Sequence, residues 1–206
     1  MRSRLWIPEI LPFYINTRKT LEAEIHAAPI MLSGHYDFYK RNAYGQEWKV
    51  GSTSNLITNA GMDLIGSSDN GFFYGNNLVL GTGASTPDVT DTTLNSFLYG
   101  QIVSSYQTGS MVSASGEFYT TARAGVLIDF GNANGIITEV GIRKEAGSIL
   151  FSRSLIKDSS GTPTSITKTS EEQLIVYYTL RRDIYTGSMV STVTLDGNSY
   201  DCEVRC

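Results

Sequence analysis

Charged residues are scarce in this chain: Asp, Glu, Lys and Arg make up 17% of its 206 residues, against about a quarter in typical soluble domains. A lone soluble monomer usually carries more charge for colloidal stability, so the low charge favours a protein whose surfaces are covered by partners. The net charge is −4. Because nucleic-acid-binding proteins normally carry a basic surface, no nucleic-acid partner is expected.

Long apolar runs are also missing. No stretch approaches the roughly 18 apolar residues that span a bilayer, so no membrane partner is expected. The first fifteen residues are largely apolar, but Pro8, Glu9 and Pro12 interrupt them and no small-residue cleavage site follows closely, which disfavours a signal peptide. Since prolines exclude a long regular helix, residues 1–32 are predicted to form an extended arm lying on a neighbouring chain. Its interface candidates are Trp6, Ile10, Phe13 and Tyr14.

Cysteine and histidine number only two each. Cys202 and Cys206 cannot form a four-ligand zinc site alone, and their spacing is not that of a redox C-x-x-C motif. They are either free thiols or candidates for a disulfide within or between chains, which requires an oxidising environment. His26 and His35 belong to no metal-binding or catalytic motif. No metal and no cofactor are therefore expected.

Strand-forming patterns fill the rest of the chain, separated by turn residues. One short helix is predicted at 58–65, capped by Asn59 and weakened by Gly61. The predicted strands are a hairpin within 33–52 with its return strand at 47–50, then 78–80, 97–107, 116–130, 136–144, 148–155 and 173–181.

Alternation along these runs predicts which residues form the core. In the last run Leu174, Val176, Tyr178 and Leu180 share one face, and Ile175, Tyr177 and Thr179 share the other. In 116–130 one face is predicted to hold Phe118, Thr120, Ala122, Ala124, Val126, Ile128 and Phe130. Strands at this spacing predict a mainly β chain, an antiparallel β-sandwich with one short helix, whose body spans 33–186.

A separate C-terminal β-hairpin is predicted at 187–206, with its turn at Asp196-Gly197-Asn198. An isolated hairpin is marginally stable in water, so this one is expected to dock on a partner. Val193, Leu195 and Tyr200 are its interface candidates.

Catalytic patterns are weak. Gly81-Thr82-Gly83 follows a strand but is not completed into a phosphate-binding motif, which favours a tight loop. Asp88 and Asp91 are interpreted as turn and capping residues, and with Asp129 they show no spacing typical of glycoside hydrolysis. The twelve tyrosines suit strands or protein interfaces, with glycan binding as the alternative. No enzyme activity is expected.

Three runs in order, the last of which carries two motifs, resemble a family of small bacteriophage virion structural proteins of the tail-fibre, collar and minor tail type. The resemblance covers residues 33–183. It rests on Asn55-Leu56-Ile57 with Gly61; on Gly81, Thr82, Gly83, Pro87, Asp91 and Leu94; on Thr138-Glu139-Val140-Gly141; and on Leu150-Phe151-Ser152-Arg153 with Asp158, Gly161 and Pro163.

The resemblance implies a β-sandwich component of the virion, assembled in the host cytoplasm, that forms a symmetric oligomer and has no catalytic residues. Its implied partners are copies of itself and other tail, collar or fibre proteins. The segments 1–32 and 187–206 lie outside the resemblance, and an adaptor joined by arm exchange and sheet packing is the function expected. A fibre module that binds host-surface polysaccharide is the alternative.

Overall fold

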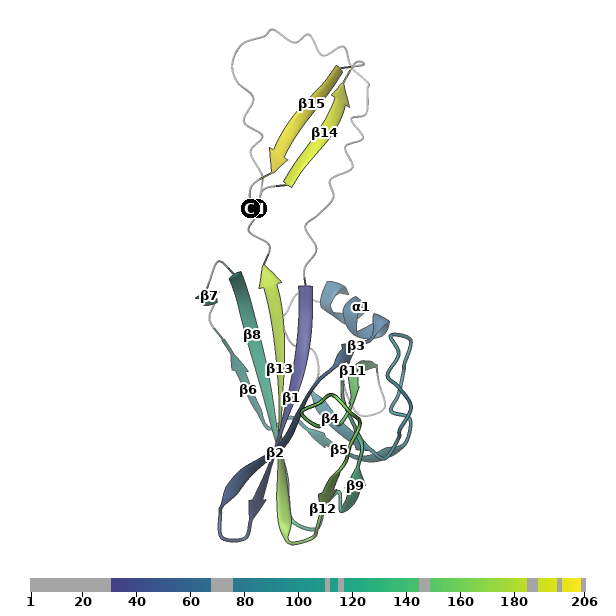
Figure 1. The fold of residues 1–206 in the computed structure, drawn as a ribbon, viewed down its shortest axis with the longest axis vertical. Helices are drawn as coiled ribbons and strands as arrows, with labels where there is room; N and C mark the ends of the chain where they lie inside the picture. Colours follow the sequence, from purple (N-terminus) through teal and green to yellow (C-terminus); the bar gives the residue numbers. More distant parts are fainter. Residues whose placement is uncertain are drawn as a thin grey trace. The chain divides into compact units, whose positions relative to one another are not determined.

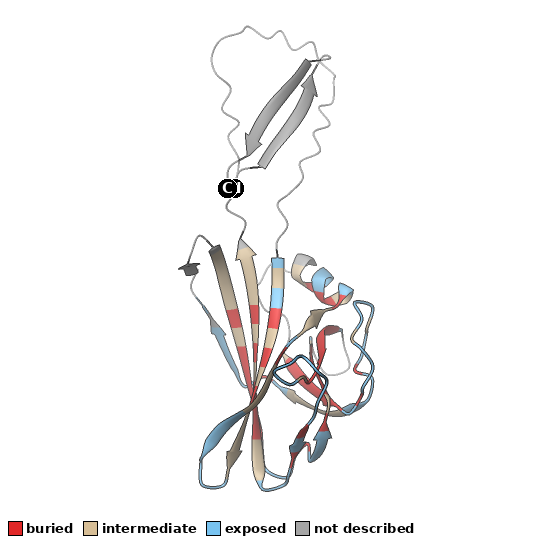
Figure 2. Cartoon of the chain, viewed as in Figure 1, coloured by how far each residue is buried: buried red, intermediate tan, exposed pale blue. Residues whose placement is uncertain are grey.

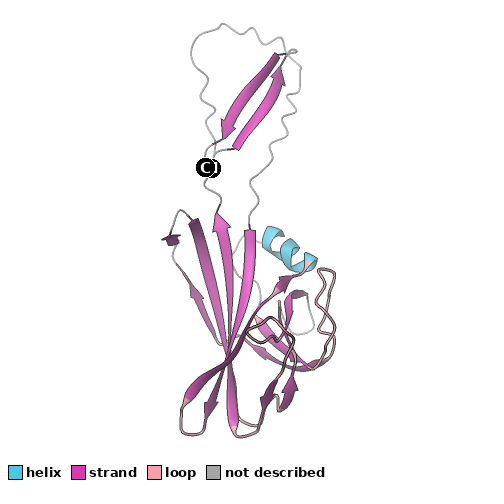
Figure 3. Ribbon diagram, in the orientation of Figure 1, coloured by secondary structure: helices cyan, strands magenta, loops and turns pink. Residues whose placement is uncertain are grey.

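Two antiparallel β-sheets share one hydrophobic core in the computed structural model (Figure 1). The structure describes residues 31–67, 76–109, 112–114, 117–144, 149–184, 189–195 and 198–204. Among these residues strands dominate, and α1 (Asn59–Ser67) is the one helix (Figure 3). The predicted fold class, an antiparallel β-sandwich with one short helix, is confirmed.

The first sheet has six described strands in the order β2-β1-β13-β8-β6, with β7 also paired to β8. They are β1 (Met31–Asn42), β2 (Glu47–Ser54), β6 (Ser105–Thr108), β7 (Val112–Ala114), β8 (Glu117–Ile128) and β13 (Glu172–Ile184). β13 lies at the centre and pairs with β1 on one side and β8 on the other.

Alternation in β13 and β8 turns one apolar face of this sheet toward the core, as predicted. Tyr177 and Thr179 on the opposite face of β13 remain partly exposed. The prediction for Phe130 is wrong: β8 ends at Ile128, so Phe130 lies beyond the strand and is 40% exposed. The predicted core residues that are buried are Ala122, Ala124, Val126, Ile128, Leu174, Val176, Tyr178 and Leu180 (Figure 2).

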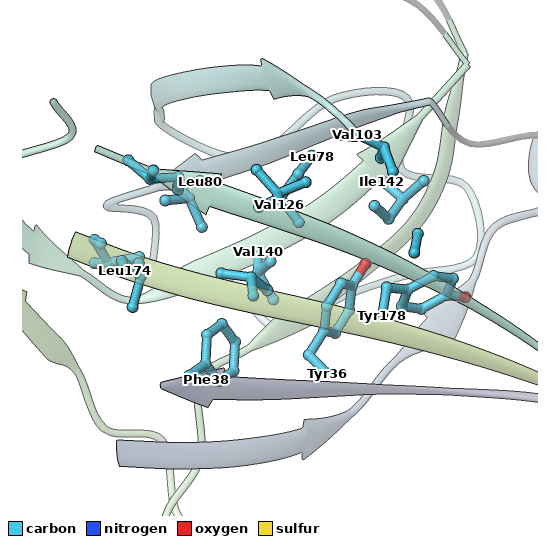
Figure 4. Packing of buried hydrophobic residues seen from close by; sticks show 14 of the residues in the cluster. Tyr36, Phe38, Leu78, Leu80, Val103, Val126, Val140, Ile142, Leu174 and Tyr178 are labelled. Atoms are coloured by element: carbon cyan, nitrogen blue, oxygen red, sulfur yellow. The ribbon is translucent and has the colours of Figure 1, made fainter. Parts of the chain in front are cut away.

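The second sheet has the order β3-β11-β10-β4-β5. Its strands are β3 (Leu56–Ile57), β4 (Asn77–Gly81), β5 (Phe97–Ile102), β10 (Glu139–Arg143) and β11 (Leu150–Leu155). A two-stranded ribbon of β9 (Gly135–Ile137) and β12 (Ile166–Lys168) adds Ile137 and Ile166 to the core. Side chains from both sheets meet in the core shown in Figure 4, among them Tyr36, Phe38, Leu78, Leu80, Val140, Ile142 and Tyr178.

Two tyrosine hydroxyls are buried in this apolar core and both are hydrogen-bonded. The Tyr36 hydroxyl lies 2.8 Å from Ser152 Oγ on the second sheet, and Asn55 Nδ2 donates to the Tyr178 hydroxyl at 2.9 Å. The two rings lie 4.7 Å apart. Burial raises the pKa of both phenols above the ordinary value, because the interior disfavours a phenolate.

The chain crosses from the first sheet to the second between β2 and β3, and α1 follows directly after β3. The cap is Thr58 rather than the predicted Asn59: the amide of Gly61 donates to Thr58 Oγ1 at 2.9 Å. Gly61, which weakens the helix by propensity, has a packing role, because an added Cβ would overlap the carbonyl of Phe151 in β11.

Several predicted boundaries are corrected. The run 136–144 is two strands: β9 pairs with β12, whereas β10 pairs with β11 and β4, and Thr138 separates them. The run 97–107 is also two strands, β5 and β6, on different sheets. β2 extends to Ser54, and β3, just before the predicted helix, and β12 have no counterpart in the prediction.

The C-terminal hairpin belongs to a second compact unit. β14 (Met189–Leu195) pairs antiparallel with β15 (Asn198–Val204), so the predicted hairpin is confirmed, although Asn198 belongs to the strand rather than the turn. In this register Val193 pairs with Tyr200 and Ser191 with Cys202, which places two interface candidates at one cross-strand position. The predicted arm at 1–32 lies outside the described residues except for Met31 and Leu32, which begin β1.

Candidate functional site

Three of the sequence motifs meet at a buried ion cluster on the second sheet. Arg153 of β11, with a side chain 2% exposed, lies beside Glu139 of the neighbouring β10, which is fully buried. Arg153 Nε donates to Glu139 Oε2 at 2.9 Å and its Nη1 donates to Asp91 Oδ2 at 2.6 Å. Arg153 Nη2 donates to the carbonyl and the hydroxyl of Ser85 at 3.0 and 2.9 Å. One guanidinium therefore joins the sheet to the loop of residues 82–96.

Backbone amides of the same loop bind the Glu139 carboxylate. Gly83 and Ser96 donate to Oε1 at 2.9 and 2.7 Å, and Asn95 donates to Oε2 at 3.1 Å. Gly81 and Gly83 allow this approach, because a Cβ at either position would overlap the Glu139 carboxylate. The glycine-rich segment is thus a tight loop, as predicted, and its amides bind an anion supplied by the chain itself.

Asp88 and Asp91 both act in the turn of this loop, as predicted. Asp88 Oδ1 accepts hydrogen bonds from the amide and hydroxyl of Thr90, and these bonds lower the pKa of Asp88. Asp91 Oδ2 also accepts from the Asp88 amide at 2.9 Å. The ion pair of Asp91 with Arg153 was not predicted. The sequence did contain a signal for a buried ion pair: Glu139 and Arg153 lie inside the apolar runs IITEVGI and LFSRSLI. The hairpin predicted for these two runs brings them together.

The outer face of the first sheet, defined as the face turned away from the core, carries Tyr39, Tyr119 and Tyr177. Tyr177 of β13 lies over Gly125 of β8, where an added Cβ would stand 3.2 Å from the ring. The Arg123 guanidinium lies 3.9 Å from the centroid of the Tyr177 ring, and Tyr39 meets that ring edge-on with centroids 5.8 Å apart. A second stack places the Arg181 guanidinium 4.0 Å from the Tyr119 ring centroid.

A hollow of about 390 Å³ lies on this part of the sheet. In the register, Thr179 lies between Tyr177 and Arg181 on β13, and Thr121 lies between Tyr119 and Arg123 on β8. Short hydroxyl side chains therefore separate the two stacks. The lining residues are Leu32, Ser33, Gly34, His35, Ser54, Asn55, Thr121, Thr179 and Arg181.

Arg123 differs from the other basic residues of the outer face. Lys49 and His35 contact Asp37 at 2.7 and 3.5 Å, and Arg181 pairs with Asp183. Within the described part of the chain, Arg123 has no ion-pair or hydrogen-bond partner, and its Nε is buried. A guanidinium held over a tyrosine ring, without a countercharge among the described residues, is suited to bind an acidic or carbonyl group of another molecule.

Trp6, Ile10, Phe13, Tyr14 and Cys206 lie outside the described residues, and Val193, Leu195, Tyr200 and Cys202 belong to the separate hairpin. The outer face itself was missed, because strand alternation does not distinguish an exposed tyrosine face from strand filling. Among the described residues no group of three or more His, Cys, Asp or Glu side chains is placed to hold a metal ion.

Comparison with family models, with curated proteins and with solved structures finds no match. None of the described helices is long and apolar enough to cross a membrane.

Proposed function

We propose that this chain is a non-enzymatic structural component of a bacteriophage virion, acting as an oligomeric adaptor in the tail, collar or fibre-attachment apparatus. The observation that carries the adaptor role is the outer face of the first sheet. Tyrosine and arginine are the residue types enriched at protein interfaces and at their energetic hot spots. Here Arg123 and Tyr39 already pack against the Tyr177 ring, so little side-chain entropy is lost when a partner covers them.

The motifs of the resemblance support the same role. Glu139, Arg153 and Asp91 satisfy one another and the loop 82–96, so they contribute to the fold rather than to chemistry on a substrate. The location in a virion is proposed from the resemblance alone. The adaptor role is proposed from the outer face of the first sheet.

The two extensions are the expected contacts to neighbours. The arm 1–32 is proposed to lie on another copy or another virion protein, anchored by Trp6, Phe13 and Tyr14. The hairpin β14–β15 is proposed to dock in the same way, because a two-stranded sheet lacks independent stability.

The test has two parts. The chain is expected to form a defined oligomer in solution by light scattering, and Tyr177→Ala combined with Arg123→Ala is expected to weaken that oligomer or its incorporation into particles. Tyr44→Ala is the matched control, because Tyr44 is 91% exposed at the tip of the β1–β2 hairpin. The proposal fails if mass spectrometry does not detect the chain in purified virions of the phage that encodes it.

A second function, binding of host-surface polysaccharide, is favoured by the hollow on the outer face. Its hydroxyl and amide side chains, between two tyrosine–arginine stacks, offer hydrogen bonds to a sugar. A glycan array with the wild-type chain and with Thr179→Val tests this function, and saturable binding that the substitution reduces is the expected result.

A further inference from the structure

Lys168 is a buried lysine at the end of β12. The residue is 1% exposed and pairs in register with Gly135 of β9. Its Nζ donates to Asn134 Oδ1 at 3.4 Å and to the Thr169 carbonyl at 3.2 Å. Among the described residues no carboxylate lies within ion-pair distance of this ammonium, since the nearby Glu172 pairs with Lys40 at 2.9 Å.

Such an environment disfavours the ammonium form relative to a lysine in water. A buried ammonium is costly unless a carboxylate pairs with it. Burial lowers the pKa of Lys168, although the charges of Glu172 and Asp129 oppose that shift and the charge of Lys40 adds to it. A neutral lysine amine is a nucleophile, as in the enzymes that use lysine for covalent chemistry.

The group facing that amine is the carboxamide of Asn134, an exposed residue whose side chain is hydrogen-bonded within its own turn. Asn134 Nδ2 donates to the Gly131 carbonyl at 2.9 Å, while Asn134 Oδ1 accepts from Lys168. The turn carrying Asn134 has positive φ angles at Gly131, Ala133 and Gly135, of 75°, 49° and 127°. Alanine rarely adopts a positive φ, so this turn is held by its surroundings.

We propose that Lys168 and Asn134 form an intramolecular amide bond between their side chains. The lone pair of Nζ attacks Cγ of Asn134, and the Cγ–Nδ2 bond then breaks. One proton passes from Nζ to the leaving nitrogen, so the chain loses one molecule of ammonia. No oxidant or other reactant is consumed.

The bond would tie β12 to the turn between β8 and β9, two segments 34 residues apart. Closing a loop covalently reduces the freedom of the unfolded chain. A particle that must survive outside the cell gains from such a link, but the inference does not depend on the proposed function, because it rests on the local geometry alone.

The test is the intact mass of the denatured full-length chain. The wild-type protein is expected to be lighter than its sequence by one ammonia, with a branched peptide joining Lys168 to Asn134 in the proteolytic digest. Lys168→Arg and Asn134→Ala are expected to show the full mass calculated from the sequence. Lys157→Arg is the matched control and is expected to lose one ammonia, as the wild type does.

Asn134 precedes Gly135, and cyclisation of asparagine on a following glycine nitrogen also releases ammonia. The two reactions are distinguished by Lys168→Arg, which abolishes the proposed loss but leaves cyclisation intact. A wild-type mass equal to the sequence mass, or a loss of ammonia that persists in Lys168→Arg, would overturn the proposal.

Discussion

Replacing Arg153 with methionine should be among the most damaging single substitutions in the body. Methionine fills a similar volume but removes the hydrogen bonds to Glu139, Asp91 and Ser85. The Glu139 carboxylate would keep its three backbone amide donors from the loop 82–96. It would, however, remain buried without a countercharge. The substitution therefore tests whether the guanidinium, rather than the backbone amides alone, holds the loop on the sheet.

The magnitude follows from the burial of the pair. Breaking a buried ion pair by removing one partner costs about 3–5 kcal/mol, whereas an exposed pair contributes about 0–1 kcal/mol. With side chains 2% and 0% exposed, Arg153 and Glu139 belong to the first class. Stabilities of natural domains are about 5–15 kcal/mol, so the loss would be a large fraction of the total.

Equilibrium urea unfolding of the wild type and Arg153→Met gives the difference directly. Arg41→Met is the matched control: it removes an ion pair with Glu47 whose side chains are 37% and 33% exposed, and a loss below about 1 kcal/mol is expected. Adding Glu139→Leu to Arg153→Met should cost less than the sum of the two single losses, because no unpaired charge remains. A loss below about 1 kcal/mol for Arg153→Met alone would refute the reasoning.

Three further predictions concern the core, the helix and the acid range. Burial raises the pKa of Tyr36 and Tyr178 above 10.0. The stabilisation from keeping these phenols neutral is therefore complete below that pH and is lost as the pH rises above it. Absorbance titration should show both phenols ionising only as the chain unfolds. Gly61→Ala should lower the melting temperature measured by circular dichroism despite the better helix propensity of alanine, because its Cβ meets the backbone of β11. Burial raises the pKa of Glu172, but the hydrogen bonds from Lys40 and Thr169 outweigh burial, so the net shift is downward from 4.5. The stabilisation that the ionised Glu172 contributes is therefore present above that pH and is lost as the pH falls. Unfolding titrations should therefore show a shallower acid dependence in Lys40→Met.

Much of the fold could be predicted because the apolar residues of long strands alternate. In β13 and β8 every second residue faces the core, and a two-residue period in the sequence is enough to identify both strands and their buried faces. Short strands carry too few residues for that period to be visible. β3 and β12, with two and three residues, exist because of their neighbours and not because of their own sequence.

The candidate sites depended on contacts between distant segments. Asp91, Glu139 and Arg153 were each noticed within a motif, but their meeting depends on the pairing of β10 with β11 and on the path of a loop. The stack of Arg123 on Tyr177 depends likewise on the register between β8 and β13. Side chains at one cross-strand position become neighbours only when that register is known.

The pairing of β1 with β13 determines how the body would respond to a mechanical load. β1 begins at Met31, and Met31 pairs with Asp183, one residue before β13 ends. A force pulling the two flanking segments apart would therefore break the cross-strand hydrogen bonds in sequence from this end, which requires little force at any moment. A force that pulls one flanking segment against the opposite end of the body would instead shear the whole ladder at once. If the extensions are anchored to different neighbours, the direction of the strain between those neighbours decides whether the sandwich yields or holds.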